Sequence, residues 1–235
     1  MRVYIGYDER EAAAYAVAAA SLAGTSPQAQ AIKLDAARLS AHGLFRRPMD
    51  RRDGRIYDLA SDAYCATDFA ITRFLVPLLE QQGWALFVDC DMVFLSDVAE
   101  LFAMADASKA VMVVKHGNLA STAPKMDCQP QQLYARKNWS SVMLFNCGHP
   151  ANRRLSLRDI NERPGRDLHQ FYWLHDSEIG ALPQEWNWLV NVAPKPAQPR
   201  IAHFTLGGPW LPTWEGADHD SIWLDAQRWL QTPSI

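Results

Sequence analysis

The sequence lacks the features of a secreted or membrane-spanning chain. Its 235 residues include only four cysteines, with no C-x-x-C pair and no spacing typical of metal ligands. Because no signal peptide is recognisable either, we expect free thiols in a reducing compartment and a cytoplasmic protein. The alanine-rich stretch at 12–23 is too short and too weakly apolar to cross a bilayer, so no integral membrane segment is predicted.

A strong excess of one charge is also missing. The formal net charge is -3, which gives no electrostatic reason to expect binding to nucleic acid or to an anionic membrane surface. Basic residues are concentrated at 46–55 alone, which we interpret as a solvated loop, with contact to an anionic ligand as the alternative. A hydrophobic content of 49% and a charged content of 21% are ordinary for a globular chain. The length fits a single domain over residues 1–235.

The order of apolar segments predicts an α/β fold with a mostly parallel central sheet. A strand at 2–7, an alanine-rich helix at 9–22 and a strand at 30–34 form a β-α-β unit. Further on, the spacing of apolar residues predicts a helix at 68–82 and a buried strand that begins at 85. Later segments read as strands at 110–115, 142–146 and 201–204, a loop near the acceptor at 117–136, and helices at 176–182 and 220–230.

Two carboxylates follow the apolar run at 85–88. Because side chains alternate along an extended chain, Asp89 and Asp91 point the same way where the apolar run stops. Two like charges beside a dry core favour a cation between them, and carboxylate oxygens suit a hard divalent ion. The same pair could also simply end the strand and cap the next turn, since an isolated D-x-D motif is common by chance.

Other candidate residues lie where ligands bind in open α/β sheets. Tyr7 and Asp8 end the first strand, where they could hold a nucleotide base or could only pack and cap the next helix. Arg73 is either a surface arginine or a phosphate ligand. Six of the nine tryptophans lie between Trp186 and Trp229, and Trp210 stands among glycine and proline, where stacking on a sugar or a base is favoured over core packing.

In this order the motifs resemble the family 8 glycosyltransferases, which are retaining enzymes with the GT-A (Rossmann-like) fold that use nucleotide-diphosphate sugars. The similarity extends over about residues 2–210. The matching patches are Tyr7-Asp8, R-x-x-x-P at Arg73–Pro77, the strand with D-x-D at Phe87–Asp91, a strand ending in Asn at Val142–Asn146, Asp176 followed by L-P-x-x-W-N at Leu182–Asn187, and H-F-x-x-G-x-P-W at His203–Trp210.

The resemblance implies a transferase that moves a hexose from a nucleotide-diphosphate sugar, UDP-sugar in the first place, to a hydroxyl of a saccharide or other glycan acceptor, with polysaccharide biosynthesis as a context. It implies that Asp89, Asp91 and His203 bind Mn²⁺ or Mg²⁺ at the diphosphate. The resemblance also implies nucleotide contacts by Tyr7, Asp8 and Arg73, and it places Asn146 and Asp176 near the donor sugar. From their charge, Asp176 and Glu178 are the candidates to stabilise or attack the anomeric carbon. Gly207 and Gly208 could offer backbone N–H groups to a phosphate.

The sequence departs from the family pattern at two places. Gly208 stands where the family carries a lysine before Pro-Trp, and Asp176-Ser177-Glu178 stands where the family has Asp-Gln-Asp. Loss of the lysine removes a cation that would stabilise the leaving phosphate. This leaves open a non-catalytic nucleotide- or sugar-binding protein on the same fold. A phosphohydrolase of the haloacid-dehalogenase type also stays open, because that class too places D-x-D after an apolar strand.

Overall fold

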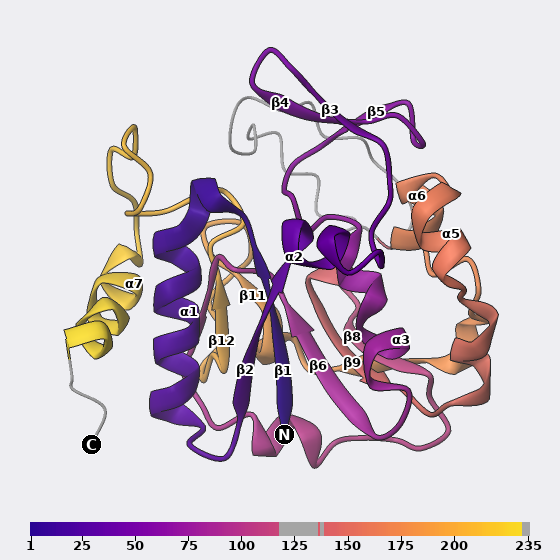
Figure 1. Cartoon of the computed structure of the whole chain (residues 1–235). Helices are drawn as coiled ribbons and strands as arrows, with labels where there is room; N and C mark the ends of the chain where they lie inside the picture. The colour runs from indigo at the N-terminus through magenta and orange to yellow at the C-terminus, as the bar shows by residue number, and fades with distance from the viewer. Residues whose placement is uncertain (118–135, 137–138, 232–235) are drawn as a thin grey trace.

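A six-stranded mixed sheet forms the centre of the protein (Figure 1). The computed structural model describes residues 1–117, 136 and 139–231. The strands of this sheet are β1 (Arg2–Tyr7), β2 (Gln30–Asp35), β6 (Trp84–Val88), β8 (Val111–Val114), β9 (Val142–Asn146) and β10 (Ile179–Leu182). Their order is β10-β8-β9-β6-β1-β2. Apolar side chains cover both faces of β6, β8 and most of β9, as expected for central strands buried between layers.

Five of these strands run in one direction, and β9 is antiparallel to its two neighbours. The carboxyl ends of β1, β6 and β8 therefore meet at one edge of the sheet, which we call the carboxyl edge, whereas β9 begins there. Residues that follow β1 and β6 are brought together at this edge, where open α/β sheets bind ligands.

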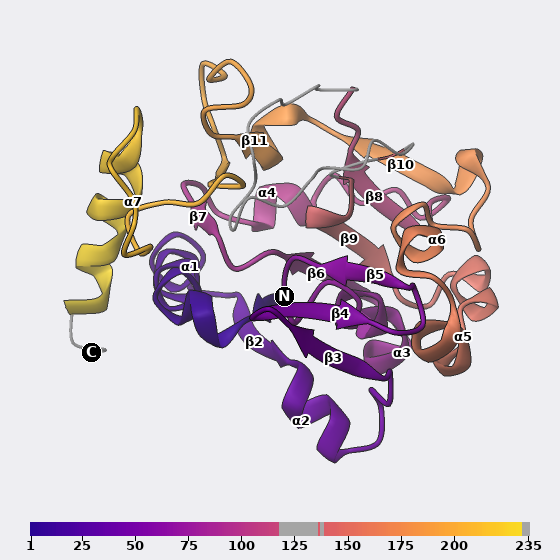
Figure 2. The same cartoon turned by 90° about the horizontal axis from the view of Figure 1, so that it is seen from above.

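The β-α-β unit predicted at the amino terminus is confirmed. The Asp8 carboxylate caps a 3-10 turn at Glu9–Glu11, and α1 (Ala12–Thr25) follows and leads back to β2, which pairs parallel with β1. The closing helix α7 (Asp220–Gln227) lies beside α1 on the side away from the sheet, as Figures 1 and 2 both show.

A second sheet brings the late part of the chain to the carboxyl edge. Its strands are β7 (Met92–Phe94), β11 (Trp188–Leu189) and β12 (Ile201–His203), in the order β11-β12-β7. Because β12 and β7 are antiparallel, His203 at the end of β12 pairs with Met92 at the start of β7. A smaller apolar cluster that includes Trp188, Phe204 and Trp223 fills the space between this sheet and α7.

The basic stretch at 46–55 is mostly exposed, as predicted, but it forms strands rather than a loop, and Arg47 is buried. It enters a three-stranded antiparallel sheet that stands above the carboxyl edge, which we call the arm (Figure 2), and which consists of β3 (Met49–Arg52), β4 (Arg55–Asp58) and β5 (Ala63–Cys65). Arg47 has a fully buried side chain whose Nε and Nη2 donate to Asp58 at 2.8 and 2.6 Å. Such a desolvated, two-pronged pair fixes the base of the arm, because removing either partner would leave a buried charge without a counterion.

The remaining helices are short. They are α2 (Ala36–Ala41), α3 (Val76–Glu80), α4 (Ala99–Phe102), α5 (Leu157–Glu162) and α6 (Gly165–His169). The helix predicted at 68–82 is confined to a 3-10 turn at Thr72–Leu75 and α3, because Pro77 is tolerated only in a first turn. The helix predicted at 176–182 is wrong: a 3-10 turn at Asp176–Glu178 leads into β10, whose pairing with β8 decides the local structure.

No helix within the described residues is long and apolar enough to span a bilayer. Cys65, Cys90 and Cys147 are free thiols, as predicted, and Cys128 lies outside the described residues. The predicted acceptor loop at 117–136 also lies outside them, except for its two end residues.

Candidate functional site

Two carboxylates and one imidazole converge at the carboxyl edge. Asp89, Asp91 and His203 each offer a ligand atom, and these atoms lie within 4.8 Å of one another. The Nε2 atom of His203 is 3.3 Å from Oδ1 of Asp91. The structure thus brings together the three residues that the resemblance names as metal ligands.

The topology explains how residues more than 110 positions apart in the chain meet. The main chain leaves β6 at Val88, passes through Asp89 and Asp91, and enters β7 of the second sheet. Antiparallel pairing of β12 with β7 then sets the end of β12 beside the start of β7. The Phe204 amide donates to the Asp91 carbonyl at 2.9 Å, which locks His203 next to the acidic pair.

Arg73 holds one of the carboxylates in place. Its side chain is nearly buried, and its Nη1 atom lies 2.8 Å from Oδ1 of Asp89 and donates to the Ser140 carbonyl at 2.8 Å. The guanidinium carbon lies 4.9 Å from the centre of the Phe87 ring. Arg73 therefore acts on Asp89, although the sequence led us to expect it at the nucleotide or a phosphate.

A third carboxylate, which the sequence gave no reason to single out, makes the site strongly acidic. Glu11 is 2% exposed, and its Oε2 atom accepts a hydrogen bond of 3.3 Å from the fully buried thiol of Cys90. Burial, and then the charge of Asp91, raise the pKa of Glu11 to about 8. A site that rejects a further negative charge in this way favours a cation of high charge.

This raised pKa makes the stability of the ion-free protein depend on pH. In the unfolded chain Glu11 ionises near pH 4.5, whereas in the folded chain it stays neutral up to about pH 8. Below about pH 4.5 Glu11 is neutral in both states and does not change the free energy of unfolding. As the pH rises from there to about 8, the free energy of unfolding falls by up to about 1.36 kcal/mol per pH unit. Measured in EDTA by chemical denaturation, wild type should lose stability relative to Glu11→Gln across this window. Parallel stability curves for the two proteins would contradict the assignment.

Asp89, Asp91, His203 and Glu11 together form what we call the acidic cluster. A further buried histidine lies near it. His116 follows β8 at the carboxyl edge, and burial, with a smaller effect from His203, lowers its pKa to about 4. Its Nε2 atom is buried and makes no hydrogen bond with the described residues. The sequence gave no reason to expect His116 at this edge, because it stands beside no recognisable motif.

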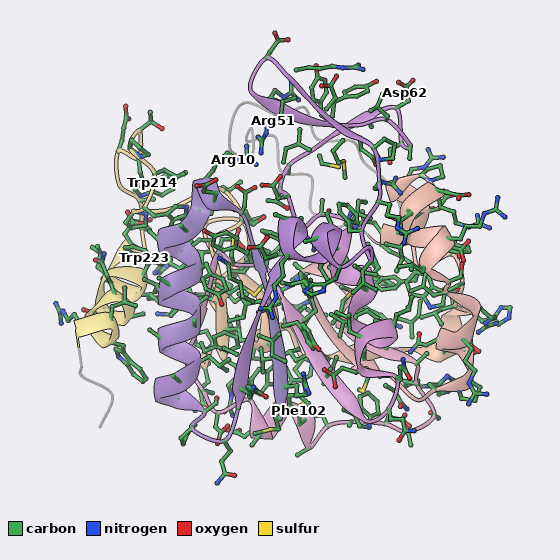
Figure 3. All side chains as sticks on the ribbon, viewed as in Figure 1. Arg10, Arg51, Asp62, Phe102, Trp214 and Trp223 are labelled. Carbon is green, nitrogen blue, oxygen red and sulfur yellow. The ribbon has the colours of Figure 1, made fainter. Side chains whose placement is uncertain are left out.

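The two residues at the end of β1 are engaged by the protein itself. Burial acts to raise the pKa of Asp8, but hydrogen bonds from Arg10 and from the Asp68 amide outweigh it and lower the pKa. The guanidinium of Arg10 also donates to the Ala66 carbonyl at 2.8 Å and so connects this edge to the end of the arm. Figure 3 labels Arg10 beneath Arg51.

Tyr7 is covered by a neighbouring side chain. The ammonium of Lys33 lies 3.2 Å from the centre of the Tyr7 ring and covers one of its faces.

The glycine turn after β12 has a geometric reason for lacking the lysine of the family pattern. A Cβ atom on Gly208 would lie 2.3 Å from the ring of Trp210, so any side chain there requires that ring to move. Gly207 has φ +106°, a conformation suited to glycine, and its amide donates to the Phe204 carbonyl at 2.8 Å, which takes it away from a phosphate. Trp210 packs with Phe204 and Trp223 in the smaller apolar cluster, which favours the core role over the predicted ligand contact.

Asn146 and Glu178, two of the three predicted donor-sugar residues, lie at the opposite edge of the sheet. Asn146 pairs with Trp84 at the start of β6, whereas Asp89 follows its end, roughly 16 Å away at about 3.3 Å per residue. Strand β9 is antiparallel, so its last residue faces the opposite edge. Glu178 precedes β10 at that same edge and pairs with Arg154, and Asp176 is exposed and pairs with Arg136.

Comparison with known proteins shows the family. No protein-family model matches the chain. The Arabidopsis thaliana protein named Protein CDI is 38% identical over 231 residues, which cover 95% of this chain and 85% of that protein. The chain belongs to the family of Protein CDI. That name states no activity.

Solved glycosyltransferases show the fold of this CDI-family chain. The galactosyltransferase LgtC, solved in complex with donor and acceptor sugar analogs, has a TM-score of 0.59 at 12% identity over 99% of this chain and 97% of its own. GlyE of Streptococcus pneumoniae TIGR4 has a TM-score of 0.61 at 13% identity, covering 98% of this chain and 62% of its own. Mouse xyloside xylosyltransferase 1 has a TM-score of 0.56 at 12% identity, covering 86% of this chain and 96% of its own. The fold is GT-A, which confirms the predicted fold class.

Proposed function

We propose that this chain is a metal-dependent hexosyltransferase of the family 8 type. In this proposal it moves a hexose from a UDP-sugar to a hydroxyl of a saccharide or other glycan acceptor, with retention at the anomeric carbon. The observation that carries the proposal is the convergence of Asp89, Asp91 and His203 at the carboxyl edge of a GT-A sheet. The haloacid-dehalogenase alternative loses its support, because the chain has a different fold.

The donor set fits Mn²⁺ or Mg²⁺. Two carboxylates and a nitrogen suit a hard or borderline divalent ion. When bound, such an ion supplies charge neutralisation for a diphosphate leaving group. Arg73 keeps the Asp89 carboxylate oriented, and pairing of β12 with β7 fixes the position of His203.

The proposed retention needs either a nucleophile of the protein or attack by the acceptor hydroxyl on the face from which the diphosphate leaves, with assistance from the leaving group. The two candidates to stabilise or attack the anomeric carbon are paired with arginines, Asp176 with Arg136 and Glu178 with Arg154. We therefore favour the second route. The second candidate, a non-catalytic binding protein, is favoured by one observation, the closed space at Gly208 where a phosphate-binding lysine would stand.

A thermal-shift panel tests the donor class. UDP, GDP, ADP and CDP are each added with Mn²⁺ or with EDTA, and UDP with Mn²⁺ should raise the Tm selectively. At a ligand concentration of 100 times Kd, binding adds about 2.7 kcal/mol, which corresponds to about 5–10 °C for a chain of this size. A shift of equal size in EDTA would contradict the ion site. Metal-dependent UDP binding without hydrolysis or transfer of any UDP-hexose would favour the binding protein.

A further inference from the structure

A buried amide lies directly behind the histidine of the acidic cluster. Asn187 is fully buried, and its Oδ1 atom is 2.9 Å from Nδ1 of His203. On its other side the Asn187 amide nitrogen donates to Oγ of Ser141 at 2.9 Å. Ser141 and His203 are themselves nearly buried, so the row of three side chains runs through the protein interior to the carboxyl edge.

The chemistry of this row decides which nitrogen of His203 carries the proton. An amide oxygen only accepts, so Nδ1 must hold the hydrogen when Asn187 is oriented by its bond to Ser141. A neutral imidazole with a proton on Nδ1 leaves the lone pair on Nε2. That atom lies 3.3 Å from Oδ1 of Asp91, another acceptor, so the two atoms repel unless a cation or a proton lies between them.

We infer that Asn187 is a positioning residue that fixes the orientation and the tautomer of His203, so that Nε2 faces Asp91 as a ready ligand for the divalent ion. The inference rests on the proposed function for the identity of the ion, but the tautomer can be read from the ion-free protein. Outer partners of this kind orient metal-binding histidines, and their loss weakens metal binding about 10- to 100-fold.

The test combines two readouts on matched variants. Long-range ¹⁵N–¹H NMR of the His203 ring in EDTA reports the tautomer, and calorimetric titration with Mn²⁺ reports affinity. Asn187→Leu should lose the fixed Nδ1–H form and bind Mn²⁺ about 10- to 100-fold more weakly. Asn187→Asp keeps an acceptor toward Nδ1 and should retain the tautomer and bind at least as tightly as wild type, because a carboxylate is the stronger acceptor. Ser141→Ala removes the hydroxyl that accepts from the Asn187 amide and should give an intermediate affinity.

Asn152 supplies the control. It is also a buried asparagine, and its side chain bonds Trp173 and two carbonyls at the opposite edge of the sheet. Asn152→Leu should therefore lower stability without changing the His203 tautomer or the Mn²⁺ affinity, which separates loss of a buried amide from loss of positioning.

The outcomes distinguish the two proposals. A wild-type His203 with its proton on Nε2, or wild-type Mn²⁺ affinity in a folded Asn187→Leu, overturns the role of Asn187. A wild type that shows the Nδ1–H form but binds no divalent ion overturns the metal-dependent function and leaves the tautomer assignment standing. If Asn187→Leu does not fold, the comparison of Asn187→Asp, Ser141→Ala and wild type decides, and equal affinity in all three overturns the inference.

Discussion

Replacing Asp91 with asparagine should lower kcat/KM for sugar transfer about 1,000-fold. Asparagine keeps the size of the side chain but removes a negative charge that faces both Asp89 and the Nε2 atom of His203. A bound divalent ion contributes several kcal/mol to stabilising charge in the transition state, and about 4 kcal/mol corresponds to a 1,000-fold change in rate. The measurement is steady-state transfer from the UDP-sugar that the thermal-shift panel selects, over a range of Mn²⁺ concentrations.

Asp225 provides the matched control for this substitution. It lies exposed on α7 in a surface pair with Arg228, so Asp225→Asn removes the same charge far from the cluster and should leave kcat/KM unchanged. Wild-type transfer by the Asp91 variant would show that the acidic cluster is not the ion site. A thermal shift with UDP and Mn²⁺ that persists in this variant would lead to the same conclusion.

Replacing Arg73 with methionine should destabilise the protein by about 3 kcal/mol in EDTA. Methionine has a similar length, so packing against Phe87 is largely kept, whereas Asp89 loses its 2.8 Å partner. Breaking a buried ion pair costs about 3–5 kcal/mol, because the remaining charge is left without compensation. For a chain of this size, about 3 kcal/mol lowers the Tm by about 6–12 °C.

Saturating Mn²⁺ should recover part of this loss, because a dication at Asp89 compensates the same charge. The control is Arg228→Met, which breaks an exposed pair and should change the Tm little. Equal Tm values for the two variants in EDTA would mean that Arg73 contributes no more than a surface arginine.

A local pattern was enough to predict the two aspartates of the cluster. An apolar run followed by D-x-D indicates a buried strand with two carboxylates on one side of its end. The structure has this arrangement at Asp89 and Asp91. The position of His203 depends on strand pairing across more than 100 residues, so no local pattern could place it. Only the order of motifs, through the family resemblance, indicated that it would join the pair.

The sequence failed where the direction of a strand decides which residue faces the site. A terminal asparagine on a strand was expected at the donor sugar, but β9 runs antiparallel, so its first residues lie at the carboxyl edge and Asn146 lies at the other. The signal for Asn187 was present in the L-P-x-x-W-N motif, yet its role depends on a hydrogen bond to His203 that no spacing reveals. Glu11 belongs to no motif, and only the fold shows that it is buried beside Cys90.

The close contact between Gly208 and Trp210 means that the residue at one position limits which side chain fits at the other. A lysine introduced at 208 would collide with the indole, and trimming the indole would open a hole beside Phe204 and Trp223. The family pattern has its lysine directly before Pro-Trp, so a lysine at 208 requires another position of the indole rather than its loss. The ring of Trp210 must therefore lie differently in a relative that carries the lysine, even where the Pro-Trp pair is the same.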